Sequence, residues 1–423
     1  MSQKQFNIQK NDVNILRHLA REVIQREQSE INLERKNAWL AFANNNAYRP
    51  LVLTETDGGL QLINPHHSLM CKEYWAKEIE HRWKEMILHF DTIKDDRVIQ
   101  ANAHWSWHID LGNFGVDTER KRGVDSHGGQ TGYEIIYPIK NIETDLHLLK
   151  SRNFNVNRET SILQKQCLED TLGDLVTIRP RGFPAWSLGL SRHAIMLIGL
   201  EQFLVSMFES PDKLHQLMDF LREDTLKLLN WLESEKILCL NNEQDYIGSG
   251  SFGWTDQLPT KEFNGTPRLC DLWFLFESQE TSCVGSKQFE EFVFNYAKPI
   301  FEKIGYIYYG CCEPVHTIWH LLKTVTNIKR VSCSPWTDQD FMAKALGDQY
   351  GFSRKPSPTL VSTNVFDEDL IRNDLGITLK ACIKHGVRNL EFVMKDVHTL
   401  NNEPWRLARW VEITREEIQK YYK

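Results

Sequence analysis

Short apolar segments that each end in a few reactive side chains recur along the second half of this chain. Residues 307–309 lead into the sequence GCCEP at 310–314, and the sequence VSCSPW follows at 331–336. Similar segments lie at 272–277, 351–356 and 390–396, with helix-forming stretches between them. This alternation predicts an α/β protein, a single (β/α)₈ TIM barrel. In that fold the catalytic residues lie at the C-terminal ends of the strands.

Length and composition limit the possible partners and location. The chain has 423 residues, a length at which α/β barrels commonly form one domain. A net charge of -7 predicts no nucleic-acid partner, and no apolar stretch is long enough to predict a membrane span. Residues 1–10 lack the apolar core of a signal peptide. Nine cysteines in such a chain indicate reduced thiols and a cytoplasmic location.

The first part of the chain differs from the repeating part. Residues 12–44 read as helix, which predicts an N-terminal helical extension over 1–45 and a barrel over 46–423. Residues 101–142 are irregular in pattern and rich in Gly, His and Trp. We expect them to form a lid-like insertion over the barrel mouth.

Thiols and carboxylates follow three neighbouring predicted strands. Cys311, Cys312 and Glu313 end one strand, Glu277 ends the strand before it, and Cys333 ends the strand after it. Zinc prefers thiolate, imidazole and carboxylate ligands, and an open catalytic site uses three of them. Because side chains alternate along a strand, only one of the adjacent cysteines can point inward, and we favour Cys312. The alternative is that these cysteines are small core residues.

Basic residues end two further predicted strands. Arg354 and Lys355 suit a substrate carboxylate or phosphate. The alternative is a structural ion pair with Glu313 or Asp396. Lys395 and Asp396 form a second such pair, which either binds substrate or neutralises the acidic mouth of the barrel.

Other candidate substrate contacts lie outside these segments. Arg179 and Arg181 follow an earlier strand and are expected to line the mouth, and Trp336 follows a later one. Trp107 belongs to a polar–aromatic stretch that either cages a quaternary ammonium by cation–π attraction or packs on the core as an edge strand. The sequence GSGSFG at 248–253 formally matches a dinucleotide fingerprint, but no clean helix follows it. We interpret it as a flexible loop at the mouth.

Several of these strings resemble the uroporphyrinogen decarboxylase superfamily. The closest resemblance is to a poorly characterised corrinoid methyltransferase-like branch sometimes labelled trimethylamine corrinoid protein 2, and it covers roughly residues 45–423. The strings that carry the resemblance are GSGSFGWTDQLP at 248–259, ESQE at 277–280, YGCCEP at 309–314, SPW at 334–336 and SRKP at 353–356.

The chain also departs from the pattern of the superfamily. The decarboxylase has an arginine-rich loop after strand one, and here residues 55–59 read ETDGG, which argues against a porphyrinogen substrate. The methyltransferase branch has a metal-binding His where this chain has Gly310. The last metal-binding Cys of that branch belongs near strand eight, where this chain has Lys395 and Asp396 instead.

The resemblance implies a zinc-dependent methyltransferase that acts on a small molecule. The methyl group would come from a methylated small molecule or from a separate corrinoid protein, which would carry the cobalamin because the chain lacks a cobalamin-binding motif of its own. The thiols and Glu277 would hold the metal, the basic residues would fix an anionic group, and Asp396 or Glu313 would move a proton. One alternative is a metal-independent decarboxylase or lyase acting on a small carboxylate. Another is a non-catalytic corrinoid or tetrapyrrole binding protein.

Overall fold

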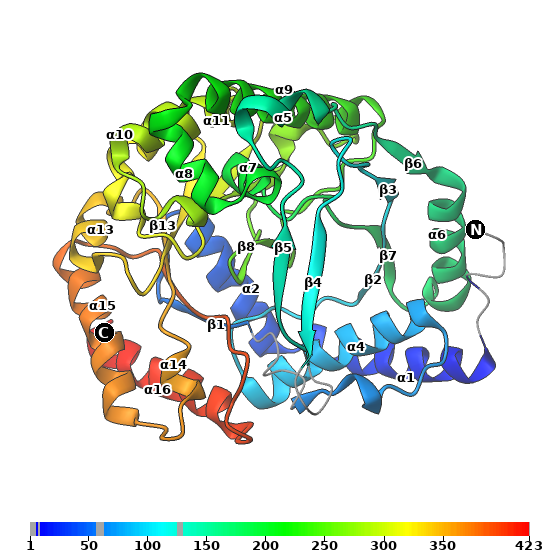
Figure 1. Ribbon diagram of the computed structural model, residues 1–423. Coiled ribbons are helices and arrows are strands. Elements are labelled where there is room, and N and C mark those ends of the chain that lie inside the picture. The colour runs from blue at the N-terminus through cyan, green and yellow to red at the C-terminus, as the bar shows by residue number, and fades with distance from the viewer. Residues whose placement is uncertain (1–5, 7–8, 56–62, 125–129, 423) are drawn as a thin grey trace.

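The computed structural model describes residue 6 and residues 9–55, 63–124 and 130–422. Its centre is a parallel sheet surrounded by helices (Figure 1). Six strands pair in parallel in the following order: β1 (Leu51–Thr54), β14 (Leu390–Met394), β13 (Gly351–Arg354), β12 (Ile328–Cys333), β11 (Tyr306–Tyr309) and β10 (Trp273–Phe276).

Two more strands form a separate parallel pair, β2 (Asn102–Trp105) with β7 (Thr177–Pro180). The two sheets together supply eight parallel strands in a barrel-like α/β arrangement. Strand pairing does not join the two sheets within the described ranges, so a closed barrel is not seen there.

The longer helices surround the sheets (Figure 1). They are α1 (Lys10–Glu27), α2 (Glu30–Ala43), α4 (Tyr74–Leu88), α6 (Arg158–Leu172), α7 (Leu190–Ile198), α8 (Leu200–Glu209), α9 (Pro211–Ser234), α13 (Gln339–Leu346), α15 (Glu368–Lys384) and α16 (Trp405–Tyr421). Shorter helices are α5 (Ile142–Asp145), α10 (Ser286–Phe289), α11 (Asn295–Phe301), α12 (Trp319–Leu322) and α14 (Thr359–Ser362). None of the described helices has the length and apolar character that crossing a membrane requires.

The strands of the large sheet are buried on both faces. Phe274, Ile307, Val331, Phe352 and Phe392 belong to the main hydrophobic cluster, which they share with the surrounding helices. Neighbouring residues on the same strands face the other way, into the interior of the strand array. Burial on both faces explains why these segments read as nearly continuous apolar runs.

A short hairpin of β8 (Tyr246–Gly248) and β9 (Ser251–Phe252) fills this interior. A Cβ atom on Gly248 would lie 2.6 Å from Leu275 Cδ1 and 3.0 Å from Tyr308 Cδ1, both on central strands. Gly248 also has a φ of 144°, a backbone conformation that residues with a side chain rarely adopt. Glycine is therefore the residue that fits both the close packing and the backbone conformation at this position. The predicted mouth loop at 248–253 is therefore packed against the strands.

The N-terminal extension consists of two helices, and the second covers the amino ends of the strands. Phe42 of α2 packs against Gly351, the first residue of β13: a Cβ atom on Gly351 would lie 3.0 Å from the Phe42 ring. The Arg330 guanidinium makes cation–π contacts with both aromatic residues of α2: its Cζ lies 5.5 Å from the centre of the Trp39 ring and 4.7 Å from that of Phe42. The opposite edge, formed by the carboxyl ends of the strands, carries the candidate site.

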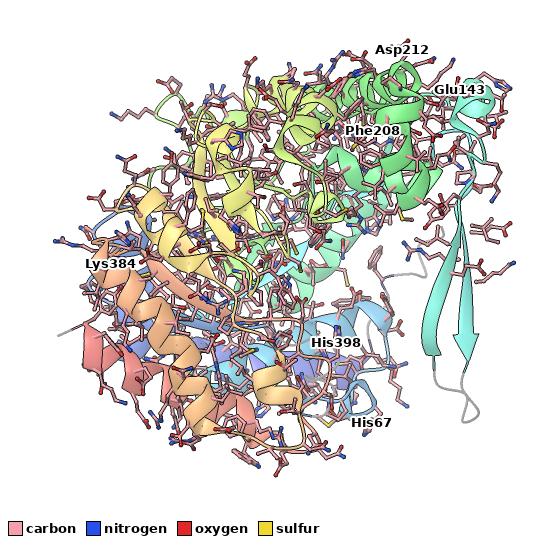
Figure 2. All side chains as sticks on the ribbon, turned by 60° about the vertical axis from the view of Figure 1, so that its left-hand side comes forward. His67, Glu143, Phe208, Asp212, Lys384 and His398 are labelled. Carbon is pink, nitrogen blue, oxygen red and sulfur yellow. The ribbon has the colours of Figure 1, made fainter. Side chains whose placement is uncertain are left out.

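The segment predicted as a lid, residues 101–142, contributes first to the sheets. Its opening residues form β2, and β3 (His108–Asp110) pairs with β6 (Asn155–Asn157). The remainder contains the hairpin of β4 (Glu119–Val124) and β5 (Gln130–Ile136), of which residues 125–129 lie outside the described ranges. Figure 2 shows this hairpin standing apart from the body of the molecule. Its role as a lid stays a prediction.

Candidate active site at the strand ends

The residues predicted to carry chemistry lie mostly at one edge of the sheet. Parallel strands end at the same edge, so side chains that follow β10, β11, β13 and β14 are brought together there. These side chains are Glu277, Cys311, Cys312, Glu313, Lys355, Lys395 and Asp396.

Cys311 and Lys395 form the centre of this edge. Lys395 Nζ lies 3.4 Å from Cys311 Sγ, 3.3 Å from Asp396 Oδ2 and 3.5 Å from Ser249 Oγ. The pKa of Cys311 is lowered to about 6, first by a hydrogen bond from the Cys312 thiol and then, against burial, by the Lys395 charge. Burial lowers the pKa of Lys395, but the Cys311 thiolate and Asp396 more than offset it, so that pKa is raised. The pair is therefore a thiolate and an ammonium at neutral pH.

Cys311, rather than Cys312, is the inward cysteine. Cys311 is 4% exposed, whereas Cys312 is exposed and its Sγ lies 3.9 Å from Asp396 Oδ2. The alternation that favoured Cys312 does not extend this far, because Gly310 adopts a φ of 97° and ends the strand geometry before either cysteine. The two sulfur atoms lie 3.7 Å apart, and Cys312, as the donor to Cys311, has a raised pKa.

Glu313 holds the loops after β10 and β11 together. Its carboxylate accepts backbone N–H bonds from Ser278 at 2.9 Å and from Cys311 at 2.8 Å. Burial raises its pKa to about 7, although both hydrogen bonds act in the opposite direction. Glu313 therefore fixes the position of the Cys311 backbone.

Glu277 ends β10, as predicted, and is 2% exposed. Its pKa is raised to about 8, first by burial and then by the nearby charges of Glu280 and Glu313. One oxygen accepts a bond from the Gln279 N–H at 3.2 Å, and the other, Oε1, is buried without a partner. At neutral pH this carboxyl group is protonated and able to donate.

The two basic residues at the end of β13, Arg354 and Lys355, have different surroundings. Arg354 donates to Asp374 at 2.9 Å and to Thr378 at 3.1 Å, both on α15, so it forms an ion pair with a partner that the sequence did not indicate. Lys355 instead turns inward, donates to the Ser353 hydroxyl and has its pKa lowered to about 8 by burial. Lys355 is the cation of this pair that lies in the interior.

Three of the remaining predicted contacts lie at the smaller sheet. Arg179 forms an ion pair with Glu243, and Arg181 pairs with both Glu243 and Asp245. Trp107 packs edge-on against Trp105 at 4.9 Å, and together with both arginines these rings line a cavity of about 570 Å³.

Trp336 follows β12 and is 75% exposed. No described contact joins it, or the residues of the smaller sheet, to Cys311.

The described residues do not assemble the zinc ligands that the resemblance implies. Cys333 is fully buried, its Sγ lies 3.9 Å from the carbonyl oxygen of Val331, and burial raises its pKa to about 12. Within the described ranges, no three His, Cys, Asp or Glu side chains are grouped so that they could hold a metal. Glu277, Cys312 and Cys333 therefore do not fit zinc as they stand, and zinc stays a prediction.

Ser249 is a site residue that sequence reasoning did not single out. It is fully buried, has a φ of 48° and lies between two glycines that also have positive φ. That backbone places its hydroxyl beside Lys395. The glycines on either side of Ser249 were the feature of the sequence that could have indicated it, because glycine allows a tight turn with positive φ against a packed sheet.

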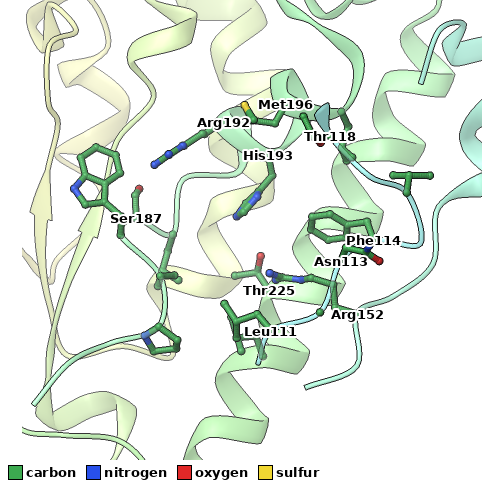
Figure 3. A pocket seen from close by; sticks show the side chains of 18 of the residues that line it. Leu111, Asn113, Phe114, Thr118, Arg152, Ser187, Arg192, His193, Met196 and Thr225 are labelled. Carbon is green, nitrogen blue, oxygen red and sulfur yellow. The ribbon is translucent and has the colours of Figure 1, made fainter. Parts of the chain in front are cut away.

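A cavity of about 470 Å³ lies beside β10 (Figure 3). Leu188, which lines it, donates its N–H to the Leu275 carbonyl of β10 at 2.9 Å. The next residue is Gly189, whose added Cβ would lie 2.2 Å from the backbone oxygen of Glu277. His193 points into the cavity, and burial lowers its pKa to about 4, so its imidazole is neutral. The cavity is thus next to the backbone that carries Glu277.

No protein-family model matches the chain, and no curated protein matches it. The solved structures that match include a methyltransferase from Methanosarcina mazei. That likeness has a TM-score of 0.49 and 11% sequence identity, and it covers 92% of this chain and 99% of the other. At this identity the likeness says nothing about activity.

Proposed function

We propose that the chain is a methyltransferase-like enzyme whose reaction centre is the Cys311 thiolate at the carboxyl end of β11. The observation that carries this proposal is the 3.4 Å contact between Cys311 Sγ and Lys395 Nζ, in a site where the thiol pKa is lowered to about 6. A thiolate is the reactive form of cysteine and a soft nucleophile toward an alkyl carbon.

Each neighbouring residue has a part in this scheme. Lys395 keeps Cys311 ionised, and Glu313 holds the backbone of Cys311 in place. Glu277 ends the strand next to Cys311, carries a proton at neutral pH and has one oxygen without a partner. As Cys311 Sγ bonds to the methyl carbon, the bond from that carbon to its carrier breaks, and Glu277 gives its proton to the departing carrier. A thiol acceptor would then take the methyl group from Cys311 and return its own proton to Glu277, which restores the Cys311 thiolate. The small-molecule substrate would approach from the strand-end edge.

Zinc and a methyl carrier on a separate corrinoid protein remain predictions from the resemblance. When bound, zinc would supply Lewis-acid activation of a thiol. Elemental analysis of protein purified without a metal-affinity tag, beside Cys312→Ser, tests this. Near-stoichiometric zinc that disappears in the variant would support zinc dependence. Metal-free wild-type protein with full turnover would rule it out.

A metal-independent lyase is the second candidate, and one observation favours it. Lys355 is buried with a pKa lowered to about 8, in the same interior as Lys395. Two cations at the strand-end edge would stabilise the carbanionic or enolic intermediate of a decarboxylation. In this scheme Cys311 would have no direct part in the chemistry.

One set of variants separates the two candidates. Methylated small molecules and methylated corrinoid are offered with thiol acceptors, small carboxylates are offered separately, and turnover is compared for wild type, Cys311→Ser and Glu277→Gln. Cys283→Ser is the matched control, because Cys283 is an exposed cysteine. We expect Cys311→Ser to lose at least about 100-fold in methyl transfer, with the control unchanged. Full decarboxylation by Cys311→Ser, together with loss of activity in Glu277→Gln, would instead establish the lyase.

A further inference from the structure

A second polar cavity lies away from the Cys311 site, and the proposed function leaves it unused. Its volume is about 250 Å³, and it lies between α4, α6 and the carboxyl ends of β2 and β7. Its polar lining includes Arg82, His104, Ser106, Gln164 and Arg181. Cations and hydrogen-bond donors therefore dominate the polar part of the lining.

Arg82 is the most unusual member of this lining. One terminal nitrogen donates to the Asn102 carbonyl at 3.0 Å, the other contacts His104 Nδ1, and Nε is buried without a partner. No Asp or Glu of the described ranges forms an ion pair with it. The pKa of this guanidinium is lowered to about 10, first by burial and then by the charge of Arg181. Asp245 and Glu85 attract this guanidinium without forming an ion pair with it, so the site has no directly bonded anion among the described residues.

His104 is a second donor without an acceptor. Its Nδ1 faces the Arg82 guanidinium, which can only donate, so Nδ1 must accept and the proton must be on Nε2. Burial and the charges of Arg82 and Arg181 lower the pKa of this imidazole and keep it neutral. The Nε2 atom is buried and has no partner.

Arg181 adds a third donor. Its terminal nitrogens pair with Glu243 and Asp245, but its Nε is buried and has no partner, and the residue is 8% exposed. Its carbonyl oxygen accepts a bond from Ser106 Oγ at 3.0 Å. The one carboxylate in the lining is Glu78, an exposed residue.

We infer that this cavity is a binding site for a small tetrahedral oxyanion, either phosphate or the phosphoryl group of a small phosphomonoester, with Arg82 as its principal ligand. The three unpaired donors come from three different elements, α4, β2 and the segment after β7. A tetrahedral anion accepts hydrogen bonds from several sides, whereas a carboxylate accepts mainly in one plane. Water would satisfy the donors but would give Arg82 no directly bonded anion. This inference is independent of the proposed function.

Calorimetric titration of the full chain with inorganic phosphate, at constant ionic strength, tests the site. Sulfate, a small phosphomonoester and succinate are titrated in parallel. We expect saturable phosphate binding by wild type and at least a tenfold weaker affinity for Arg82→Gln. The matched control is Lys77→Gln, on the exposed face of the same helix, and it should bind as wild type does. Tighter binding of the phosphomonoester than of phosphate would identify the ester as the ligand.

Three outcomes would overturn the inference. One is no binding by wild type beyond that of a chloride control, which would mean that the donors bind water only. Another is tighter binding of succinate than of phosphate. The third is equal affinity in wild type and Arg82→Gln. If Arg82→Gln does not fold, Arg82→Lys keeps the charge and loses the planar fork of donors, and we expect it to bind more weakly than wild type.

Discussion

Replacing Lys395 with methionine should raise the pKa of Cys311. The two charges lie 3.4 Å apart. At an effective dielectric constant of about 20 their attraction is worth about 5 kcal/mol, or roughly 3 to 4 pKa units. The hydrogen bond from Cys312 is the largest cause of the lowered pKa and survives the change. Because the exposed Cys312 and the partly exposed Asp396 leave this edge open to solvent, screening reduces the Lys395 attraction, and we expect a rise of about 2 units, from about 6 to about 8.

The thiolate content at neutral pH reports this shift. At pH 7 a pKa of about 6 leaves roughly nine-tenths of Cys311 ionised, and a pKa of about 8 leaves roughly one-tenth. The assay is the ultraviolet absorbance of the thiolate as a function of pH, with the curve of Cys311→Ser subtracted. The control is Lys287→Met, which removes an exposed lysine. A wild-type midpoint near 9, or an unchanged midpoint in Lys395→Met, would refute the reasoning.

Three further predictions concern stability. The pKa of Glu277 is raised from its ordinary value of 4.5 to about 8, so the wild-type protein loses stability as the pH rises from 4.5 through 8. Glu277→Gln does not titrate, and its free energy of unfolding should rise relative to wild type over that range by at most about 5 kcal/mol. Urea unfolding of both proteins at pH 5 and pH 8 measures the difference. Gly189→Ala would place a Cβ 2.2 Å from a backbone oxygen and should cost about 2 kcal/mol or more, read as a lower melting temperature. Arg330→Met removes the ion-pair partner of the fully buried Glu391, whose carboxylate lies 3.8 Å from the guanidinium, and should cost about 3–5 kcal/mol in urea unfolding. An unchanged midpoint would contradict this ion pairing.

The repeating part of the fold could be predicted from sequence because parallel strands buried on both faces leave a strong local signal. The strands at 273–276, 306–309 and 390–394 lie where the apolar runs predicted them. The strand β2 was indicated only in part: the stretch at 104–108 was one candidate for an edge strand, but the segment 101–142 as a whole was interpreted as a lid. Its place depends on pairing with β7, which is far away in the chain.

The sequence predicted which residues lie at the strand ends, but it did not predict which side chains they contact. The ends of β10, β11 and β14 do carry Glu277, Cys311 and Lys395, as the strand-end rule requires. The choice between the two cysteines depended on the φ of Gly310, which a sequence does not display. Likewise, Arg354 pairs with an aspartate on α15, because the helix that follows a strand packs back on it.

The hairpin of β8 and β9 inside the strand array also has a consequence for folding kinetics. Ser251 of this hairpin donates to Glu391 at 2.8 Å and accepts from Arg330 at 2.5 Å, so three segments far apart in the chain meet through one hydroxyl. During synthesis Glu391 emerges last, and until then Arg330 has no carboxylate to neutralise it. Such non-local contacts slow folding. We therefore expect the central array to stay unconsolidated on the ribosome until the last strand, β14, has emerged.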